Sequence, residues 1–107
     1  MKRIYTFGHE QVERNITVGD ILENKKNNNK MTQVTAANQE EAEIIANQDI
    51  DMIITGSDWY QDVRYGAPNT FITAALFAGR FITNEEILRG AFEVMMAGAD
   101  SVLTPRS

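Results

Sequence analysis

The stretch Asp51-Met52-Ile53-Ile54-Thr55-Gly56-Ser57-Asp58 decides the fold that we expect from this sequence. A short apolar run that is bounded by turn residues is typical of a buried parallel strand. A glycine, a hydroxyl and a carboxylate follow it at the carboxyl end of the strand, where α/β folds place their binding loops. We therefore expect a ligand site here, if the chain has one.

Further strands are predicted on both sides of this one, and helices separate them. The strand candidates are residues 31–35, 52–55, 70–75 and 100–104. The helix candidates begin after Thr17, Asn38 and Thr83, and a crossover at 59–65 has room for two helical turns at most. Alternation of this kind predicts a parallel sheet with right-handed crossovers, in the order β-α-β-α-β-α-β. The predicted fold class is α/β, with the helices packed outside the sheet.

Two regions of the chain differ in pattern. Residues 1–15 are predicted as an N-terminal arm or a short strand, because residues 4–7 alternate and Gly8 interrupts them. Residues 16–107 are predicted as one α/β domain. His9 is interpreted as an ordinary surface or packing histidine, since no partner for a catalytic base lies near it in the sequence.

Capping residues and spacing predict where each helix begins and which side it buries. Thr17 with Asp20, and Thr83 with Glu86, have the spacing of a capping box, and Asn38 is a candidate N-cap. Gly66 is expected to supply an unusual φ in the turn before the third strand, and Gly98 to end the last helix. The side chains expected to be buried are Val18, Ile21 and Leu22, then Ala42, Ile44, Ile45 and Ala46, then Ile87, Leu88, Ala91, Val94 and Met95.

Composition excludes several classes of function. The chain has 107 residues, of which 43% are apolar and 23% charged, as in ordinary globular domains, and its net charge of −5 argues against binding nucleic acid through bulk electrostatics. It has no cysteine, so disulfides, zinc–thiolate sites and thiol nucleophiles are excluded. No apolar run approaches the roughly 18 residues of a membrane span, and no signal peptide is recognised. A cytoplasmic location is the expectation.

Five segments carry a resemblance to a known family. They are residues 16–22 (Ile-Thr-Val-Gly-Asp-Ile-Leu), 31–38 (Met-Thr-Gln-Val-Thr-Ala-Ala-Asn), 51–58, 63–69 (Val-Arg-Tyr-Gly-Ala-Pro-Asn) and 97–102 (Ala-Gly-Ala-Asp-Ser-Val). In order and register they resemble the N-terminal part of ketopantoate hydroxymethyltransferase (3-methyl-2-oxobutanoate hydroxymethyltransferase). That family is a (β/α)₈ TIM barrel of the superfamily that handles pyruvate-like keto acids. The likeness covers about residues 15–104 and implies a half-barrel-like sheet.

The resemblance also implies a site and its chemistry. The family binds an α-keto acid through a divalent metal and transfers a one-carbon unit from methylene-tetrahydrofolate. Gly56, Ser57 and Asp58 are thereby the candidates for substrate binding, and Asp58 is the candidate metal ligand. The family has Gly-Asp-Ser here, so the carboxylate of this chain is displaced by one position. Its other metal- and substrate-binding residues fall on Ala37, Asn38, Ala75, Leu103 and Pro105. No catalytic residue is predicted, and Mg²⁺ is expected only if the family site is retained.

These departures favour a degenerate relative that works as a non-catalytic binding or assembly module. Two alternatives stay open: an enzyme with a site rebuilt around Ser57 and Asp58 for a small α-keto acid and Mg²⁺, and a part of a longer transferase. Four parallel strands cannot close a barrel, so the sheet keeps two edges and an exposed apolar face, and such sheets pair or become covered. We therefore expect a homo-oligomer that forms through a sheet edge or apolar face. The expected contact residues are Trp59, Tyr60, Phe77, Phe81 and Met96.

Overall fold

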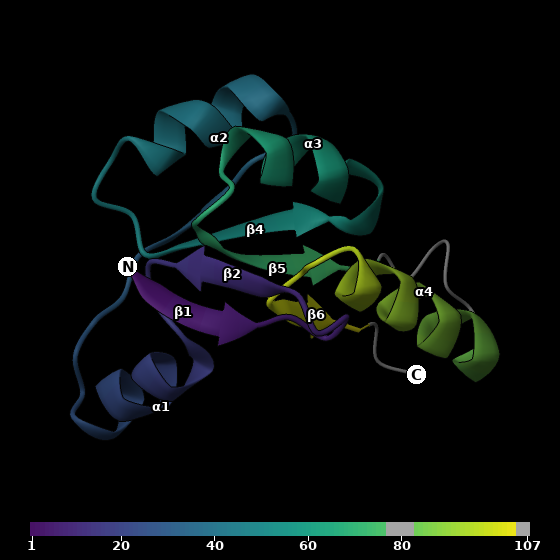
Figure 1. Cartoon of the computed structure of the whole chain (residues 1–107), viewed down its shortest axis with the longest axis horizontal. Coiled ribbons are helices and arrows are strands. Elements are labelled where there is room, and N and C mark those ends of the chain that lie inside the picture. The colour runs from purple at the N-terminus through teal and green to yellow at the C-terminus, as the bar shows by residue number, and fades with distance from the viewer. Residues whose placement is uncertain (77–82, 105–107) are drawn as a thin grey trace.

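The computed structural model of the chain describes residues 1–76 and 83–104, and Figure 1 shows their arrangement. Three layers are present: a helical layer, a parallel sheet, and an antiparallel hairpin with one further helix. The elements in chain order are β1 (Lys2–Tyr5), β2 (Gln11–Arg14), α1 (Val18–Lys26), β3 (Gln33–Thr35), α2 (Gln39–Ala46), β4 (Met52–Gly56), the 3₁₀ turn η1 (Ser57–Trp59), α3 (Tyr60–Gly66), β5 (Phe71–Ala75), α4 (Asn84–Met96) and β6 (Ser101–Leu103).

The sheet confirms the predicted α/β fold class. Its four strands are all parallel and lie in the sequential order β3-β4-β5-β6, with a helix in each connection. This is the strand order of one half of a (β/α)₈ barrel. The predicted short crossover is also confirmed, since η1 and the seven-residue α3 fill it.

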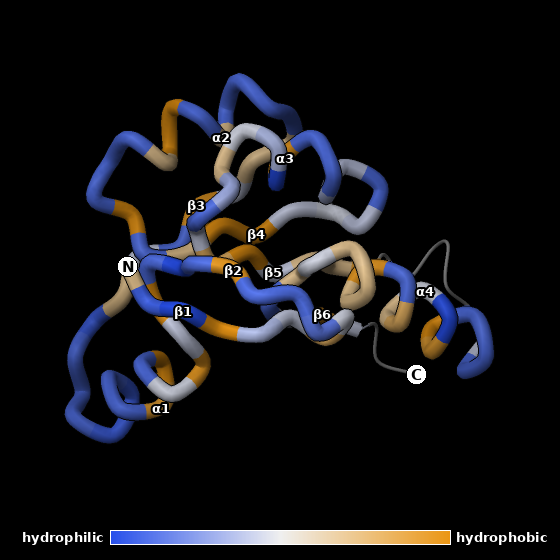
Figure 2. The backbone as a smooth tube through the Cα atoms, viewed as in Figure 1, coloured by the Kyte–Doolittle hydropathy of each residue, from blue (hydrophilic) through white to orange (hydrophobic). Residues whose placement is uncertain are grey.

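The core lies between the sheet and the helices. Ile53 of β4 and Ile72 and Ala74 of β5 point to the helical side, where they are buried with Tyr60 and Val63 of α3. Ala42 and Ile45 of α2 and Val94 of α4 complete this cluster. Figure 2 shows the hydrophobic stretches of β4 and β5 in the middle of the molecule. The buried run of strand 52–56 is thus the centre of the domain, as its sequence predicts.

The opposite face of the sheet is only half-buried in the described part of the chain. Side chains alternate along a strand, so Met52 and Ile54 of β4, Thr73 of β5 and Ser101 of β6 share this face. These four are half-buried and Leu103 is exposed, whereas Phe71, at the amino end of β5 on the same face, is buried. Parallel sheets are almost always covered on both faces, whereas the described residues leave this face partly open.

The N-terminal residues form a hairpin, where the sequence predicted only an arm or a short strand. β1 pairs antiparallel with β2, and the exposed His9 (φ 65°) lies in the connecting turn. The hairpin is fixed below the amino ends of the sheet by Asn15, whose side-chain amide donates to the Asp51 carbonyl (2.8 Å) and whose Oδ1 accepts from the Phe71 amide (2.9 Å). β2 was missed because Gln11–Arg14 holds a single apolar residue.

The predicted helix starts are confirmed. Thr17 and Asp20, and Thr83 and Glu86, form reciprocal capping boxes, and the Asn38 side chain accepts from the Glu41 amide. Lys2 of β1 also binds the Asp20 carboxylate, and hydrogen bonds from Lys2 and from the Thr17 amide hold the pKa of Asp20 below its usual range.

Several predicted buried faces are wrong. Val18, Leu22, Ile44, Ala46 and Leu88 are exposed, and Ile21, Ile87, Ala91 and Met95 are only half-buried. The physical reason is a lack of neighbours: in the described chain α1 buries no residue at all, and α2 packs against a helix on one side only. Helical periodicity reports which side is apolar, but a partner must be present to bury it.

Two glycine predictions have different outcomes. Gly98 has φ 109° directly after the C-cap Ala97, as expected of a glycine that ends a helix. Gly66 does not supply an unusual φ, which corrects the prediction. It is required for space instead, since a Cβ at Gly66 would lie 2.3 Å from the Gln39 carbonyl oxygen of α2. In the described residues, none of the helices has the length and apolar character that crossing a membrane requires.

Candidate functional site

The sequence-predicted site lies at the carboxyl edge of the sheet, as expected. Gly56 ends β4 and is buried, Ser57 opens η1, and Asp58 is exposed beside it. The hydroxyl oxygens of Thr55 and Ser57 are both buried and have no hydrogen-bond partner among the described residues. Buried hydroxyls are normally satisfied, so these two mark the end of β4 as a polar position that the chain itself leaves incomplete.

Three of the described positions at the neighbouring strand ends carry apolar side chains, and the side chain of Asn38 after β3 is used to cap α2. The register places Gly56 beside Ala75 of β5, and Ala75 beside Leu103 of β6. Ala37 follows β3 at the same edge. At Ala37, Ala75 and Leu103 the resembled family has metal- or substrate-binding residues, whereas the side chains here are hydrocarbon. Pro105 and the predicted interface residues Phe77 and Phe81 lie outside the described residues.

This donor set does not fit a resident Mg²⁺. The ion needs near-octahedral oxygen ligands, supplied by one or two carboxylates with water and substrate oxygens. Within residues 1–76 and 83–104, no three His, Cys, Asp or Glu side chains are grouped closely enough to hold a metal ion. Asp58 is the carboxylate that the loop supplies, and neither Ala75 nor Leu103 can support it. Among the described strand ends, Ala37, Ala75 and Leu103 supply no countercharge for an enolate that forms on a keto acid.

The strongest electrostatic feature lies at the opposite edge of the sheet. Nε of Arg14 on β2 donates to both carboxylate oxygens of Asp100 (2.8 and 2.9 Å), and Nη2 of Arg64 on α3 donates to Oδ2 (2.7 Å). The Ile72 amide donates to the same oxygen (3.0 Å). The side chains of Arg14 and Asp100 are each 3% exposed and that of Arg64 is 15% exposed. One carboxylate therefore holds together the hairpin, α3 and β5.

Other N–H groups of these two guanidinium groups donate to backbone oxygens. Arg14 donates to the carbonyls of Glu13, Pro68 and Gly98, and Arg64 donates to the carbonyls of Ala67 and Thr70. Nε of Arg64 donates to the Tyr60 hydroxyl (2.9 Å). Burial raises the pKa of Tyr60 above its ordinary value, so the phenol stays neutral at physiological pH. The network is bonded throughout and lies at the amino ends of the strands, where barrel folds carry stability and not catalysis.

Sequence reasoning missed this network entirely. Its three charged members are separated by 50 and 36 positions, and the resemblance segments that contain Arg64 and Asp100 were given no role for these two residues. Asp100 was assigned only to the last strand and Arg64 only to the crossover. The one available signal was the presence of charged residues at the borders of predicted buried elements, which is too common to be specific.

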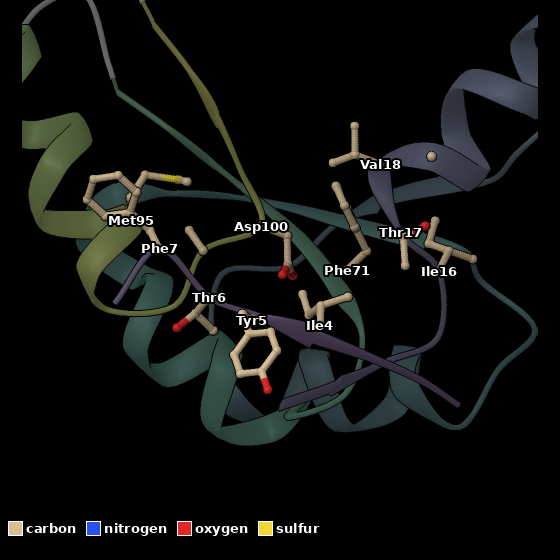
Figure 3. A pocket seen from close by; sticks show the side chains of 12 residues that line it. Ile4, Tyr5, Thr6, Phe7, Ile16, Thr17, Val18, Phe71, Met95 and Asp100 are labelled. Atoms are coloured by element: carbon tan, nitrogen blue, oxygen red, sulfur yellow. The ribbon is translucent and has the colours of Figure 1, made fainter. Parts of the chain in front are cut away.

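A cavity of about 310 Å³ lies between the hairpin, the start of α1 and the sheet (Figure 3). Ile4, Phe7, Phe71 and Met95 line it with apolar surface, and Asp100 forms part of its wall. The carboxylate of Asp100 is already bound by two guanidinium groups and an amide. The cavity therefore offers apolar contact but no unused charge.

Comparisons with known proteins add no relative to this picture. No protein-family model matches the chain, and neither a curated protein nor a solved structure matches it. The likeness to ketopantoate hydroxymethyltransferase therefore stays a prediction from the sequence, and the function is argued from the geometry alone.

Proposed function

We propose that the chain is a degenerate, non-catalytic relative of the ketopantoate hydroxymethyltransferases that works as an assembly module. The observation that carries this proposal is the half-buried face of the β3-β4-β5-β6 sheet, together with its two unpaired edges among the described residues. The loss of polar groups at Ala37, Ala75 and Leu103 supports the absence of catalysis. The chain thus keeps the scaffold of a barrel half, while three family-matched positions at its carboxyl edge have apolar side chains.

The partner that best fits this face is a second copy of the chain. A closed barrel of this type has eight parallel strands, and each copy supplies four. A two-fold axis along the barrel keeps all eight strands parallel and places β6 of one copy beside β3 of the other. This arrangement covers Met52, Ile54 and Thr73 and removes both edges at once, which is what edge strands require.

The peptide groups that strand β3 presents at its free edge can be identified from its hydrogen bonds to β4. The Thr32 carbonyl and the Ala36 amide bond to β4, so the peptide groups of the alternate residues Gln33 and Thr35 face the open side. Thr35→Pro removes one outward donor and leaves the β3–β4 bonds intact. Leu103→Lys places a charge on the exposed end of β6, which is a common way of protecting a strand edge.

The test is the molar mass in solution, measured by light scattering after size exclusion. We expect the wild-type chain to be oligomeric at micromolar concentration, and Leu103→Lys and Thr35→Pro to lower its mass. Tyr65→Lys is the matched control, since Tyr65 is exposed on α3 in the middle of the helical layer. A monomeric wild-type chain, or edge variants with the same mass as the control, would refute the proposal.

A second candidate rests on the unpartnered hydroxyls at the end of β4. Ser57 Oγ and Thr55 Oγ1 are buried and have no hydrogen bond from residues 1–76 or 83–104, and a ligand oxygen could satisfy Ser57. This favours binding of a small α-keto acid by Gly56, Ser57 and Asp58. Calorimetric titration with 3-methyl-2-oxobutanoate, with and without Mg²⁺, tests it, and the heat should disappear in Ser57→Ala. Absence of heat at ligand concentrations well above millimolar would eliminate this candidate.

A further inference from the structure

Six exposed apolar side chains lie on α1, the hairpin and α4, and we call the surface that they form the apolar belt. Two come from each of α1, the hairpin and α4. Their exposed fractions are 54% for Val18, 62% for Leu22, 71% for Tyr5, 50% for Phe7, 57% for Phe92 and 50% for Met96. Scattered exposed apolar residues are ordinary on a protein surface, whereas a contiguous group marks an interaction site.

Contacts within the chain show that the belt is continuous. The rings of Phe7 and Phe92 meet edge to face with centroids 5.6 Å apart, so the turn of the hairpin joins α4. Tyr5, Phe7 and Val18 line the same 310 Å³ cavity, which joins the hairpin to α1 (Figure 3). Leu22 lies one helical turn beyond Val18 and on the same side of α1. The belt therefore runs from α4 across the hairpin to α1, with an apolar cavity in its middle.

The size of the belt is that of a protein interface. Large apolar side chains have about 150–250 Å² each, so six of them at these exposures present roughly 650 Å². A standard interface buries about 800 Å² on each partner, and a polar rim supplies the remainder. Tyrosine, phenylalanine and methionine are also the apolar residue types that interface cores favour.

The charge of the belt differs between its elements: α1 by itself is neutral, and the positive charge opposite to that of α4 comes from Lys2 and Arg3 of β1. α4 carries three glutamates and one arginine, so its net charge is −2. β1 and α1 together carry Lys2, Arg3, Lys25 and Lys26 against Asp20 and Glu23, so their net charge is +2. Figure 1 shows α1 and α4 at opposite ends of the hairpin. A surface of this kind is complementary to itself when one copy is turned by 180°.

We propose that the apolar belt binds the belt of a second copy of this chain across a two-fold axis. In this dimer α4 of one copy lies on β1 and α1 of the other, which pairs the acidic end with the basic end twice. The cavity between the hairpin and α1 receives apolar side chains of the other copy. The contact uses neither edge strand of the sheet, so it persists if the barrel-closing contact of the proposed function is absent.

Phe92→Glu tests the apolar part of the contact. Phe92 is more than half exposed, so the variant should fold normally, as circular dichroism and urea unfolding can establish. Loss of a central aromatic contact should raise the dissociation constant of the belt dimer by roughly 30-fold or more, measured by sedimentation equilibrium. Tyr65→Glu makes the same change of an exposed aromatic away from the belt and should leave the dissociation constant unchanged. Equal constants for the two variants would overturn the proposal.

A charge exchange tests the orientation of the two copies. Lys25→Glu with Lys26→Glu reverses the basic end, and Glu85→Lys with Glu93→Lys reverses the acidic end. Each pair alone should weaken the dimer at low salt, and all four changes together should restore it, because opposite charges then face each other again. Failure of the fourfold variant to recover any affinity over the two double variants would refute the two-fold arrangement.

The failures of the two proposals are distinguishable. If both contacts form, the wild-type chain is larger than a dimer, and Phe92→Glu and Leu103→Lys each reduce it to a dimer through different surfaces. If only the belt forms, the wild-type chain is a dimer that Phe92→Glu alone dissociates. If only the sheet face pairs, Leu103→Lys alone dissociates the dimer, which refutes the belt.

Discussion

Asp100→Asn should remove a large part of the stability of this domain. The carboxylate accepts hydrogen bonds from Arg14, from Arg64 and from the Ile72 amide, and the side chains of Arg14 and Asp100 are almost fully buried. Asparagine has nearly the same shape, so the substitution changes charge and hydrogen bonding with little change in packing. It is therefore a direct measure of what the buried charge contributes.

The magnitude follows from the geometry. Oδ2 accepts from Arg64 and from the Ile72 amide, so the asparagine oxygen is expected to occupy that position. The amide nitrogen then replaces Oδ1, so Nε of Arg14 loses one of its two acceptors and keeps only the oxygen at the Oδ2 position. Two buried guanidinium groups also lose their counterion. Removal of one partner from a buried ion pair costs about 3–5 kcal/mol. Domains of this size have a total stability of about 5–15 kcal/mol.

Urea unfolding followed by circular dichroism measures this loss. With a denaturant slope of about 1–3 kcal/mol per molar urea, the midpoint should fall by one molar or more. Asp49→Asn is the control, because Asp49 is exposed in a loop, and it should change the free energy of unfolding by less than about 0.5 kcal/mol. A loss below about 1 kcal/mol in Asp100→Asn would show that the buried charge network does not stabilise the fold as reasoned.

A double-mutant cycle measures the coupling energy between Asp100 and Arg64. Arg64→Met removes one of the two cations while its chain keeps much of its apolar contact. Because each single change leaves a buried charge without its partner, the combined variant should lose less stability than the sum of the two. The expected coupling energy is about 0.5–3 kcal/mol, and strict additivity would contradict a shared network.

Two further predictions concern the helical layer. Gly66→Ala should destabilise the domain by about 1–3 kcal/mol, because its Cβ would meet the Gln39 carbonyl. Gly19→Ala in α1, where a Cβ has room, should stabilise the domain by about 0.5–1 kcal/mol. Equal effects of the two substitutions in urea unfolding would argue against close contact of α2 and α3. Burial raises the pKa of Tyr60, so the native state binds its phenolic proton more tightly than the unfolded state. The stabilising effect of this proton is complete below the ordinary tyrosine pKa of about 10 and is lost as pH rises above that value. Above about pH 10 the free energy of unfolding should therefore fall more steeply in the wild-type chain than in Tyr60→Phe.

The strand and helix pattern was predictable because it depends on local chemistry. The apolar run at 52–55, the capping residues Thr17, Asn38 and Thr83, and the short crossover each report a local preference of the backbone. The position of the candidate site was predictable for the same reason, since parallel strands all end at one edge. What the sequence could not report is which apolar faces find a neighbour, and Leu22, Ile44 and Leu88 were therefore wrongly expected inside.

By itself, the sequence determined a parallel α/β sheet centred on residues 51–58, and it predicted a ligand site at the carboxyl edge with Asp58 as the one metal ligand. Only the tertiary structure decided that Ala75 lies directly beside Gly56 and that Leu103 lies beside Ala75, because strand register is a long-range property. It also decided that Arg14, Arg64 and Asp100 form one buried network and that the hairpin links α1 to α4. Contacts between residues far apart in the chain depend on how the elements pack, and local periodicity does not report that packing.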